Sequence, residues 1–322
     1  MSCRQFKAFA WPTAVAGATL VFAAGAQADN ARAVSSLTGS DANPCTLAQP
    51  CRTLQRGINR TPDGGTLHVL DSGSYGSKAN IRKSVTILGD EHTVVLGNPV
   101  TINDADAKVV LRDLVLNGQG STLHGIKIRA ATTVRIENCV VQSFASHGIF
   151  QRLANAELFF IGSAALDNGE HGLFVDATGT TARVTVDEAR FDGNGRTGLG
   201  VLGPIDVAVR RAVATGNGTH GIALAEQTDM TVARSVAAHN GQAGYSVFLG
   251  GQMTLESSAA YGNKLGIQVI FGNTARVSNS HFVNNNTGIH IPSGSTVLTR
   301  QNNTVVGNAV DVTGTLTVID GL

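Results

Sequence analysis

A glycine followed by Ile, Leu or Tyr recurs eight times between residues 125 and 288, and this repeat constrains the fold more than any other feature of the chain. The repeat glycines are Gly125, Gly148, Gly172, Gly198, Gly221, Gly244, Gly266 and Gly288. Successive glycines lie 23, 24, 26, 23, 23, 22 and 22 residues apart. A fixed period of roughly 20–50 residues is typical of solenoids, in which each repeat stacks on its neighbours.

Each repeat contains short apolar alternations separated by turn residues. In residues 207–224, for example, apolar runs at 207–209 and 212–214 precede Asn217 and the run 221–224. A period of two predicts strands, and the missing period of 3.6 excludes helical repeats. Because each repeat holds three short strands, we predict an all-β, single-stranded right-handed parallel β-helix of about eleven coils, stacked roughly 4.8 Å apart.

The residues that follow the repeat glycines predict two columns inside the solenoid, because alternate residues of a strand share one face. The first column is Ile126, Ile149, Leu173, Leu199, Ile222, Tyr245, Ile267 and Ile289. The second column is Ile128, Gln151, Val175, Val201, Leu224, Val247, Val269 and Ile291. Gln151 is the polar member of this predicted core.

The repeat glycines and a recurring asparagine are predicted to shape the turns. We expect the glycines to adopt positive φ at the bend before the strand. Three or four residues earlier stands an asparagine, at Asn168, Asn194, Asn217, Asn240, Asn263 and Asn284 or Asn285. Asparagine also tolerates the left-handed region, and its amide can bond to the same amide one coil away. Phe144 interrupts this column.

Residues 1–28 have the pattern of a secretory signal peptide. Arg4 and Lys7 supply the positive start, an uncharged stretch follows, and a small-residue cleavage pattern ends at Ala28. Pro12 and the many small residues disfavour the alternative, a membrane anchor. No later stretch approaches the roughly 20 apolar residues of a spanning helix. We therefore expect an exported protein, periplasmic or extracellular, with no membrane span in the mature chain.

The mature chain is close to neutral. Without Arg4 and Lys7, 22 of the 24 basic residues remain, against 23 acidic ones. No basic run suggests a nucleic-acid partner. No acidic loop has regular calcium-ligand spacing, so we expect neither a metal nor a cofactor.

Two cysteines flank a short loop before the repeats. Cys45 and Cys51 are expected to form a disulfide, because the chain is exported and further metal ligands are missing from the sequence around them. Cys139 is expected to be a buried, inert thiol.

A short helix is predicted between this loop and the first coil, with Leu54 and Ile58 on one face. It would cover the open edge of the first coil, which would otherwise invite aggregation. The chain is thus divided into the signal peptide at 1–28, an N-terminal cap segment at 29–63 and the β-helix at 64–322.

Two passages carry a resemblance to a known superfamily. The segment from Thr53 to Gly76 reads as a cap helix, a glycine turn and a first strand, and the coils repeat Asn-x-x-x-Gly-Ile. Over the whole mature chain they resemble the right-handed parallel β-helix proteins of the pectate-lyase-like superfamily. The resemblance implies secreted lyases, hydrolases, epimerases or non-catalytic surface proteins as candidates.

The catalytic signatures of these families are missing. The chain has no Asp-Asp pair of the polygalacturonase kind, no Arg-x-Pro-x-x-Arg of pectate lyases and no Asp-Pro-His-Glu of alginate epimerases. Ser146-His147-Gly148 matches one fragment of the polygalacturonase pattern, but Arg135-Ile136-Glu137 precedes it instead of following it. Hydrolysis by paired carboxylates is therefore disfavoured, and no catalytic residue is predicted.

Charged and aromatic residues gather on the outward positions of the first three Gly-Ile strands. The predicted substrate-binding residues are Lys127, Arg129, Phe150, Arg152, Phe174 and Asp176. Arginine forks bind carboxylates, and an aromatic face fits the apolar side of a sugar ring. These residues predict an acidic polysaccharide as the partner, and the alternative is an ordinary solvated face.

Four histidines, His124, His147, His171 and His220, immediately precede repeat glycines. The first three fall in consecutive coils, so their rings can stack. One interpretation is a metal site or a base. We favour a turn position that caps the backbone, because only Glu170 lies nearby in sequence and a site needs convergent ligands.

The second outward column becomes apolar toward the C-terminus, at Leu202, Ala225, Phe248, Ile270 and Pro292. If these side chains face outward, a second chain has to cover them, which leaves a homo-oligomer open. We favour the other interpretation, in which the strand has ended and they turn inward.

These features predict an exported β-helix protein that binds polysaccharide or another surface partner without catalysis, since its short coils leave little loop for a deep cleft. The first alternative is a uronate polysaccharide lyase or epimerase acting at the outward Lys/Arg/Phe face, with a crowded cation as base. The second alternative is a structural or oligomeric surface protein.

Overall fold

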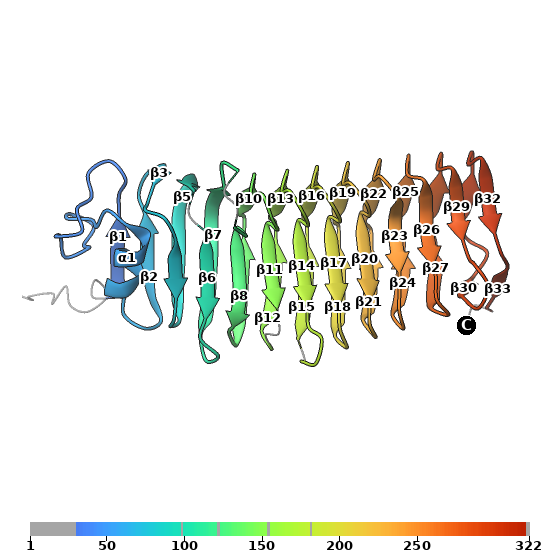
Figure 1. Cartoon of the computed structure of the whole chain (residues 1–322), viewed down its shortest axis with the longest axis horizontal. Coiled ribbons are helices and arrows are strands. Elements are labelled where there is room, and N and C mark those ends of the chain that lie inside the picture. The colour runs from blue at the N-terminus through green and yellow to red at the C-terminus, as the bar shows by residue number, and fades with distance from the viewer. Residues whose placement is uncertain (1–29, 98, 121–122, 153–154, 181, 320–322) are drawn as a thin grey trace, which may run out of the picture.

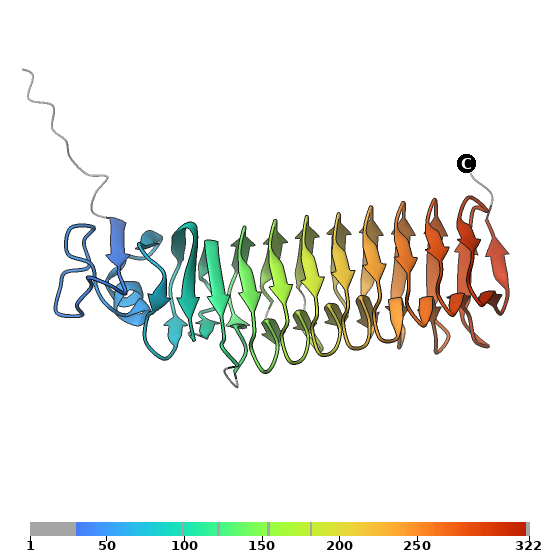
Figure 2. The same ribbon diagram turned by 90° about the horizontal axis from the view of Figure 1, so that it is seen from above.

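The computed structural model describes residues 30–319, apart from 98, 121–122, 153–154 and 181. The predicted signal peptide at 1–28 lies outside the described residues. The described part is an all-β parallel solenoid whose coils lie side by side along one axis, with a short helix at the N-terminal end (Figures 1 and 2). Within it, no helix has the length and apolar character that crossing a membrane requires.

One face of the solenoid is an 11-stranded parallel sheet, which we call sheet B, with one strand from each coil. Its strands are β4 (Ala79–Ile81), β6 (Val100–Asn103), β8 (Ile126–Ala130), β11 (Ile149–Arg152), β14 (Leu173–Asp176), β17 (Leu199–Leu202), β20 (Ile222–Ala225), β23 (Ala243–Val247), β26 (Leu265–Val269), β29 (Thr287–His290) and β32 (Val310–Thr313). Its eleven strands confirm the predicted number of coils.

The other strands form a 22-stranded sheet, sheet A, in two rows. The first row is β1 (Ala31–Val34), β2 (Gly65–Val69), β5 (Val85–Leu96), β7 (Lys108–Asn117), β9 (Thr133–Glu137), β12 (Glu157–Ile161), β15 (Arg183–Asp187), β18 (Asp206–Arg210), β21 (Asp229–Ala233), β24 (Gln252–Glu256), β27 (Thr274–Ser278), β30 (Thr296–Thr299) and β33 (Leu316–Val318). The second row is β3 (Gly73–Ser74), β10 (Val140–Gln142), β13 (Ala164–Leu166), β16 (Arg190–Asp192), β19 (Val213–Thr215), β22 (Val236–Ala238), β25 (Ala259–Tyr261), β28 (His281–Val283) and β31 (Thr304–Val306). The long strands β5 and β7 pair with both rows.

The two predicted columns form the core of the solenoid. All eight residues of the first column are at most 1% exposed, and those of the second are at most 5% exposed. Tyr245 keeps its hydroxyl satisfied by donating to the carbonyl of Ser235, at 3.0 Å. The buried amide of Gln151 donates to the carbonyl of Ala156, at 3.2 Å. The interior thus accepts polar groups where the backbone offers partners.

The asparagine column forms the predicted ladder. The Nδ2 of Asn194 donates to the Oδ1 of Asn217 at 3.0 Å, and the Nδ2 of Asn217 donates to the Oδ1 of Asn240 at 2.9 Å. Each ladder amide also donates to a backbone carbonyl, as that of Asn217 does to Phe191 at 2.8 Å. Asn285 joins the ladder, whereas its neighbour Asn284 takes the left-handed conformation. The ladder residues themselves do not have positive φ, so their tolerance of that region is not why asparagine is needed.

The predicted positive φ of the repeat glycines is wrong. Among the described residues, positive φ falls instead in the preceding turns, for example at Gly193 and Gly216. A Cβ on Gly221 would lie 2.7 Å from the carbonyl oxygen of Gly244 in the next coil, and Gly198 stands in the same relation to Gly221. Glycine is therefore required because successive coils approach too closely for a side chain.

The N-terminal end carries the predicted helix and disulfide. Helix α1 (Leu54–Arg60) begins after Thr53, whose hydroxyl accepts a hydrogen bond from the amide of Arg56. Leu54 and Ile58 are buried, as predicted. A Cβ on Gly57 would lie within 3 Å of side chains of β1 and β2, so the helix packs unusually closely on the first strands.

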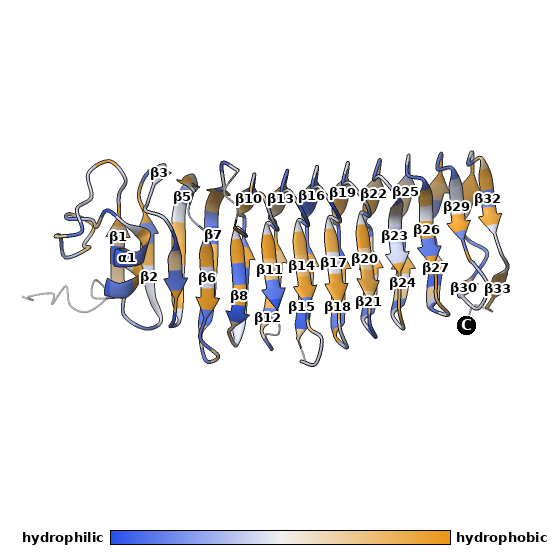
Figure 3. Cartoon of the chain, in the orientation of Figure 1, coloured by the Kyte–Doolittle hydropathy of each residue, from blue (hydrophilic) through white to orange (hydrophobic). Residues whose placement is uncertain are grey.

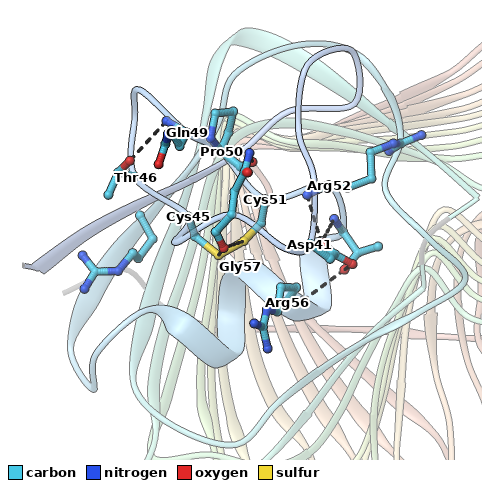
Figure 4. Close-up of a disulfide and its surroundings, with 12 residues drawn as sticks. Asp41, Cys45, Thr46, Gln49, Pro50, Cys51, Arg52, Arg56 and Gly57 are labelled. Carbon is cyan, nitrogen blue, oxygen red and sulfur yellow. Dashed lines mark hydrogen bonds between the residues drawn. A yellow bond between two sulfur atoms is a disulfide. The ribbon is translucent and has the colours of Figure 1, made fainter.

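The disulfide between Cys45 and Cys51 lies beside α1 (Figure 4). Asp41 ties this loop to the helix, because its carboxylate accepts hydrogen bonds from the amides of Arg52 and Thr53. Strand β1 pairs in parallel with β2, so the predicted cap segment also contributes a strand to the solenoid. Cys139 is a buried free thiol, as predicted, and burial raises its pKa to about 12.

Candidate functional site

The strand register brings the predicted binding residues together on the outer face of sheet B. Lys127, Phe150 and Phe174 are partners across β8, β11 and β14 and form one row. Arg152 and Asp176 are partners in the next row. Arg129 lies exposed near the end of β8. The geometric part of the prediction is therefore confirmed, whereas the binding role remains a prediction.

The charges of this cluster are only partly neutralised. The Nε of Arg152 lies 3.5 Å from the Oδ2 of Asp176. The Nζ of Lys127 lies 5.8 Å from the ring centroid of Phe150, in a cation–π arrangement. Within the described residues, neither Lys127 nor Arg129 forms an ion pair. Three cations therefore face one carboxylate, which leaves a net positive patch for an anionic ligand.

The two phenylalanines are not equivalent. Phe150 is only 9% exposed, because the rings of His124 and His147 lie 4.8 and 4.9 Å from its centroid. Phe174 stays partly exposed and stacks on His171 at 4.7 Å, with the two planes 16° apart. Phe150 is thus covered, and Phe174 is the aromatic surface that a sugar ring can reach.

The histidine column stacks as its spacing predicted. The rings of His124 and His147 are 5.0 Å apart and parallel within 2°, and His171 follows at 5.1 Å. The Nδ1 atoms of His147 and His171 accept the backbone amides of His171 and Thr197. The Nε2 of His147 lies 3.2 Å from the carboxylate of Glu170. His147 and His171 therefore cap the backbone, as we favoured. The buried Nδ1 atoms of His124 and His220 have no hydrogen-bond partner within the described residues.

Burial keeps the imidazoles neutral, although the carboxylate of Glu170 acts in the opposite direction and raises the pKa values of His124, His147 and His171. Burial lowers the pKa values of His124, His147, His171 and His220 to about 4. A second proton on His147 or His171 would also displace the backbone amide bonded to Nδ1. Within the described residues, no group of three or more His, Cys, Asp or Glu side chains is placed to hold a metal ion. The histidines are thus a structural support for the phenylalanines.

An aromatic slot of about 150 Å³ lies next to the cluster, on the same face. Its walls are His171 with Phe174 on one side and His220 with Phe248 on the other. The rings of the second pair lie 5.4 Å apart, edge to face. Between the walls the outward residues of β17 and β20 are Gly200 and Ala223, which are partners in register. Their small size leaves the space open.

The sequence contains the residue pattern that forms this slot, but the interpretation that we favoured for the apolar outward column did not predict the slot. Leu202, Ala225 and Phe248 were expected to turn inward. All three line the slot instead. Leu202 and Ala225 stay on the outer face because the strand alternation that buries Val201 and Leu224 continues to the last residues of β17 and β20. At Phe248, Ile270 and Pro292 the strand has ended, as that interpretation assumed. Figure 3 shows the change along the sheet, from blue segments on β8 to an orange β20. Two small residues after two phenylalanines in one outward column mark the slot.

Comparisons with known proteins agree with this architecture. A family model described as a right-handed β-helix region matches residues 171–319. The A-module of a mannuronan C-5 epimerase from Azotobacter vinelandii superposes with a TM-score of 0.59 at 15% identity, over 80% of this chain and 91% of that one. The chain has the pectate-lyase-like fold, a right-handed parallel β-helix. This confirms the predicted fold.

Two further solved structures share this β-helix. A pectate lyase superposes with a TM-score of 0.58 at 16% identity, over 88% of this chain and 78% of that one. A rhamnogalacturonan lyase superposes with a TM-score of 0.57 at 13% identity, over 90% of this chain and 89% of that one. No curated protein sequence matches the chain. At these identities the similarity establishes the fold and leaves the activity to be argued from the site.

Proposed function

We propose that this β-helix protein binds an acidic polysaccharide along the outer face of sheet B. The observation that carries the proposal is that the cationic cluster and the aromatic slot are continuous. In one row Lys127 and Phe150 lead through Phe174 to Gly200, and in the next row Arg152 leads through Asp176 to the slot residue Leu202. A single ligand along the axis would meet both.

The cations of the site suit the carboxylate of a uronate, and its aromatic rings suit the sugar ring. The exposed guanidinium of Arg129 and the ammonium of Lys127 can donate charge-assisted hydrogen bonds to carboxylates. The rings of Phe174 and Phe248 offer apolar surface to the C–H face of a pyranose. Adjacent strands lie about 4.8 Å apart, so the cations of β8 and β11 stand within reach of a sugar next to the one in the slot.

The structural comparisons support a polysaccharide partner. Two of the similar structures are named for mannuronan and pectate, and a third for rhamnogalacturonan. An exported location fits this partner, because polysaccharides of this kind meet proteins outside the cytoplasm. The Cys45–Cys51 disulfide supports export, since such bonds persist in oxidising compartments.

Lyase or epimerase chemistry at the same face is the second candidate function, favoured by the names of these neighbours. Both reactions need a base close to the uronate ring. Asp176 is paired with Arg152, and the Nδ1 atoms of His147 and His171 are engaged by backbone amides. Lys127 and Arg129 are left as the groups to test, by ultraviolet absorbance of unsaturated products for a lyase and by product analysis for an epimerase.

Binding is tested with polygalacturonate and alginate in a titration of the full mature chain. The variant Lys127→Ala/Arg129→Ala/Arg152→Ala is expected to bind at least ten-fold more weakly, because one charge-assisted hydrogen bond contributes about 1.5–3 kcal/mol. Filling the slot with Ala223→Leu is expected to weaken binding without changing the charge.

The matched control is Arg190→Ala/Arg210→Ala/Arg211→Ala, which removes three exposed cations from sheet A and the turn after β18. It changes the net charge by the same amount. Equal loss of affinity in the two triple variants would show that binding reflects net charge and would overturn the proposed site. Failure of both polymers to bind would overturn the proposed function.

A further inference from the structure

A groove with both polar and apolar lining follows the first row of sheet A, on a different face from the proposed site. It has a volume of about 480 Å³ and crosses β15, β18, β21, β24 and β27. A hollow of about 440 Å³ extends it to β12 and shares Arg183 and Asp206 with it. Together they cross six coils, which is about 24 Å at the spacing of parallel strands. The length suits an extended chain better than a small molecule.

The floor of this groove is flat because its outward residues are short. Thr185, Ala208, Thr231 and Thr254 are partners in register and form one row. The row continues toward the N-terminus to Phe159. The guanidinium carbon of Arg135 lies over the ring of Phe159, 4.4 Å from its centroid. Methyl groups therefore face a ligand along most of the floor, with an aromatic ring at one end.

The edge of the groove offers both hydrogen-bond donors and acceptors. Arg183, Asp206, Asp229 and Gln252 are successive partners in the neighbouring row. Arg276 closes the far end and donates to the Oε1 of Gln252 at 3.0 Å. Asp206 and Asp229 are exposed, and their carboxylates form no ion pair or hydrogen bond within the described residues. Two acceptors thus stand open at the centre, between two guanidinium groups.

We infer that this groove binds a second ligand, a neutral unbranched polysaccharide lying along the solenoid axis. Hydroxyl groups both donate and accept, so they match a row of carboxylates, amide and guanidinium groups. The two arginines and two aspartates leave the main groove without net charge. A polyuronate would bring its carboxylates against Asp206 and Asp229 at the centre, which disfavours the ligand proposed for sheet B.

No catalytic motif lies among the residues that line this groove. The lining residues recur every 22 to 26 positions as an ordinary strand alternation, and only the register shows that Asp206 and Asp229 are neighbours. This second site is independent of the proposed function, since its residues belong to another sheet.

The test is retention of the mature chain in affinity gels that contain neutral linear glucans, xylans, mannans or galactans, with polygalacturonate in a parallel gel. At least one neutral polymer is expected to retain the wild type. Asp206→Ala/Asp229→Ala is expected to weaken that retention at least ten-fold. The matched control is Lys127→Ala/Arg152→Ala on sheet B, which is expected to leave it unchanged.

Thermal unfolding of each variant checks that the fold persists. Ala208→Glu, which adds length and charge to the floor, provides a second way to block the groove. The inference is overturned if no neutral polymer retains the wild type. It is also overturned if the polymer retains both groove variants as strongly as the wild type. It is also overturned if the aspartate variant loses polygalacturonate binding instead, because the groove would then hold the acidic chain.

Discussion

The interior of the solenoid and the outer face of sheet B are built from the same strands, but their residues vary differently from coil to coil. Inside, each coil repeats its neighbour, so that the first column holds aliphatic residues in all but one position. Outside, the row beginning at Lys127 changes from a cation to two phenylalanines, then to Gly200 and Ala223. Repetition marks what holds the coils together, and variation along the axis marks where a ligand is recognised.

The asparagine ladder shows why the interior tolerates so little change. The Oδ1 of Asn217 accepts two hydrogen bonds from Asn194, at 3.1 and 3.0 Å, and its Nδ2 donates two more. Every group belongs to a buried residue. A change in one coil therefore leaves unpaired groups in both neighbouring coils.

Asn217→Ala is the change from which we expect the largest effect. Leaving two or more buried polar groups unpaired costs about 1–3 kcal/mol for each group, so the free energy of unfolding should fall by about 4 kcal/mol. Denaturant unfolding measures this value. The control Asn286→Ala removes an exposed amide and is expected to change it by less than about 0.5 kcal/mol. Equal effects at the two positions would refute the distinction between interior and surface.

Gly221→Ala should have the next largest effect, a destabilisation of about 1–3 kcal/mol, because its Cβ would press on the carbonyl of Gly244. Gly221→Asn separates this cause from backbone strain. If the glycine were needed for positive φ, asparagine would be tolerated better than alanine. We expect asparagine to be no better than alanine, and a clear rescue by asparagine in thermal unfolding would contradict the close-contact explanation.

The buried histidines should make the stability of the fold depend on pH. We expect this effect to be smaller than those of Asn217→Ala and Gly221→Ala, and to develop gradually over about two pH units. The folded chain holds His147 and His171 at a pKa of about 4, whereas the unfolded chain binds protons near the ordinary 6.5. Because the unfolded state then binds more protons, stability is full above pH 6.5 and is lost as the pH falls toward 4. The melting temperature of the wild type should fall as the pH is lowered from 6.5 to 4. In His171→Gln this fall should be less steep. An identical slope in that variant would show that the histidine does not contribute.

The sequence was sufficient to predict the parts of the molecule that repeat. The Gly-Ile period predicted the inward columns, the register of Lys127 with Phe150 and Phe174, and the stacking of the histidines. Local cysteine spacing predicted the disulfide, and the apolar pair Leu54 and Ile58 predicted α1. Each of these depends on contacts between residues a fixed number of positions apart, which a period reveals.

Features that depend on distances between coils could not be predicted. The close approach of Gly221 to the next coil is a contact between backbones, and no residue pattern distinguishes it from a turn with positive φ. The covering of Phe150 by two imidazoles depends on side-chain orientation. The slot opened because β17 and β20 continue one residue further than expected, which keeps Leu202 and Ala225 on the outer face.

The most direct test of the account is hydroxyl-radical footprinting of the mature chain with and without polygalacturonate. Phe174, Leu202 and Phe248 line the slot, whereas Phe271 is 68% exposed and lies outside it. We expect the polymer to reduce oxidation of the three slot residues and to leave Phe271 unchanged. Bound polymer with undiminished oxidation at Phe174, or with equal protection of Phe271, would contradict recognition at the outer face of sheet B.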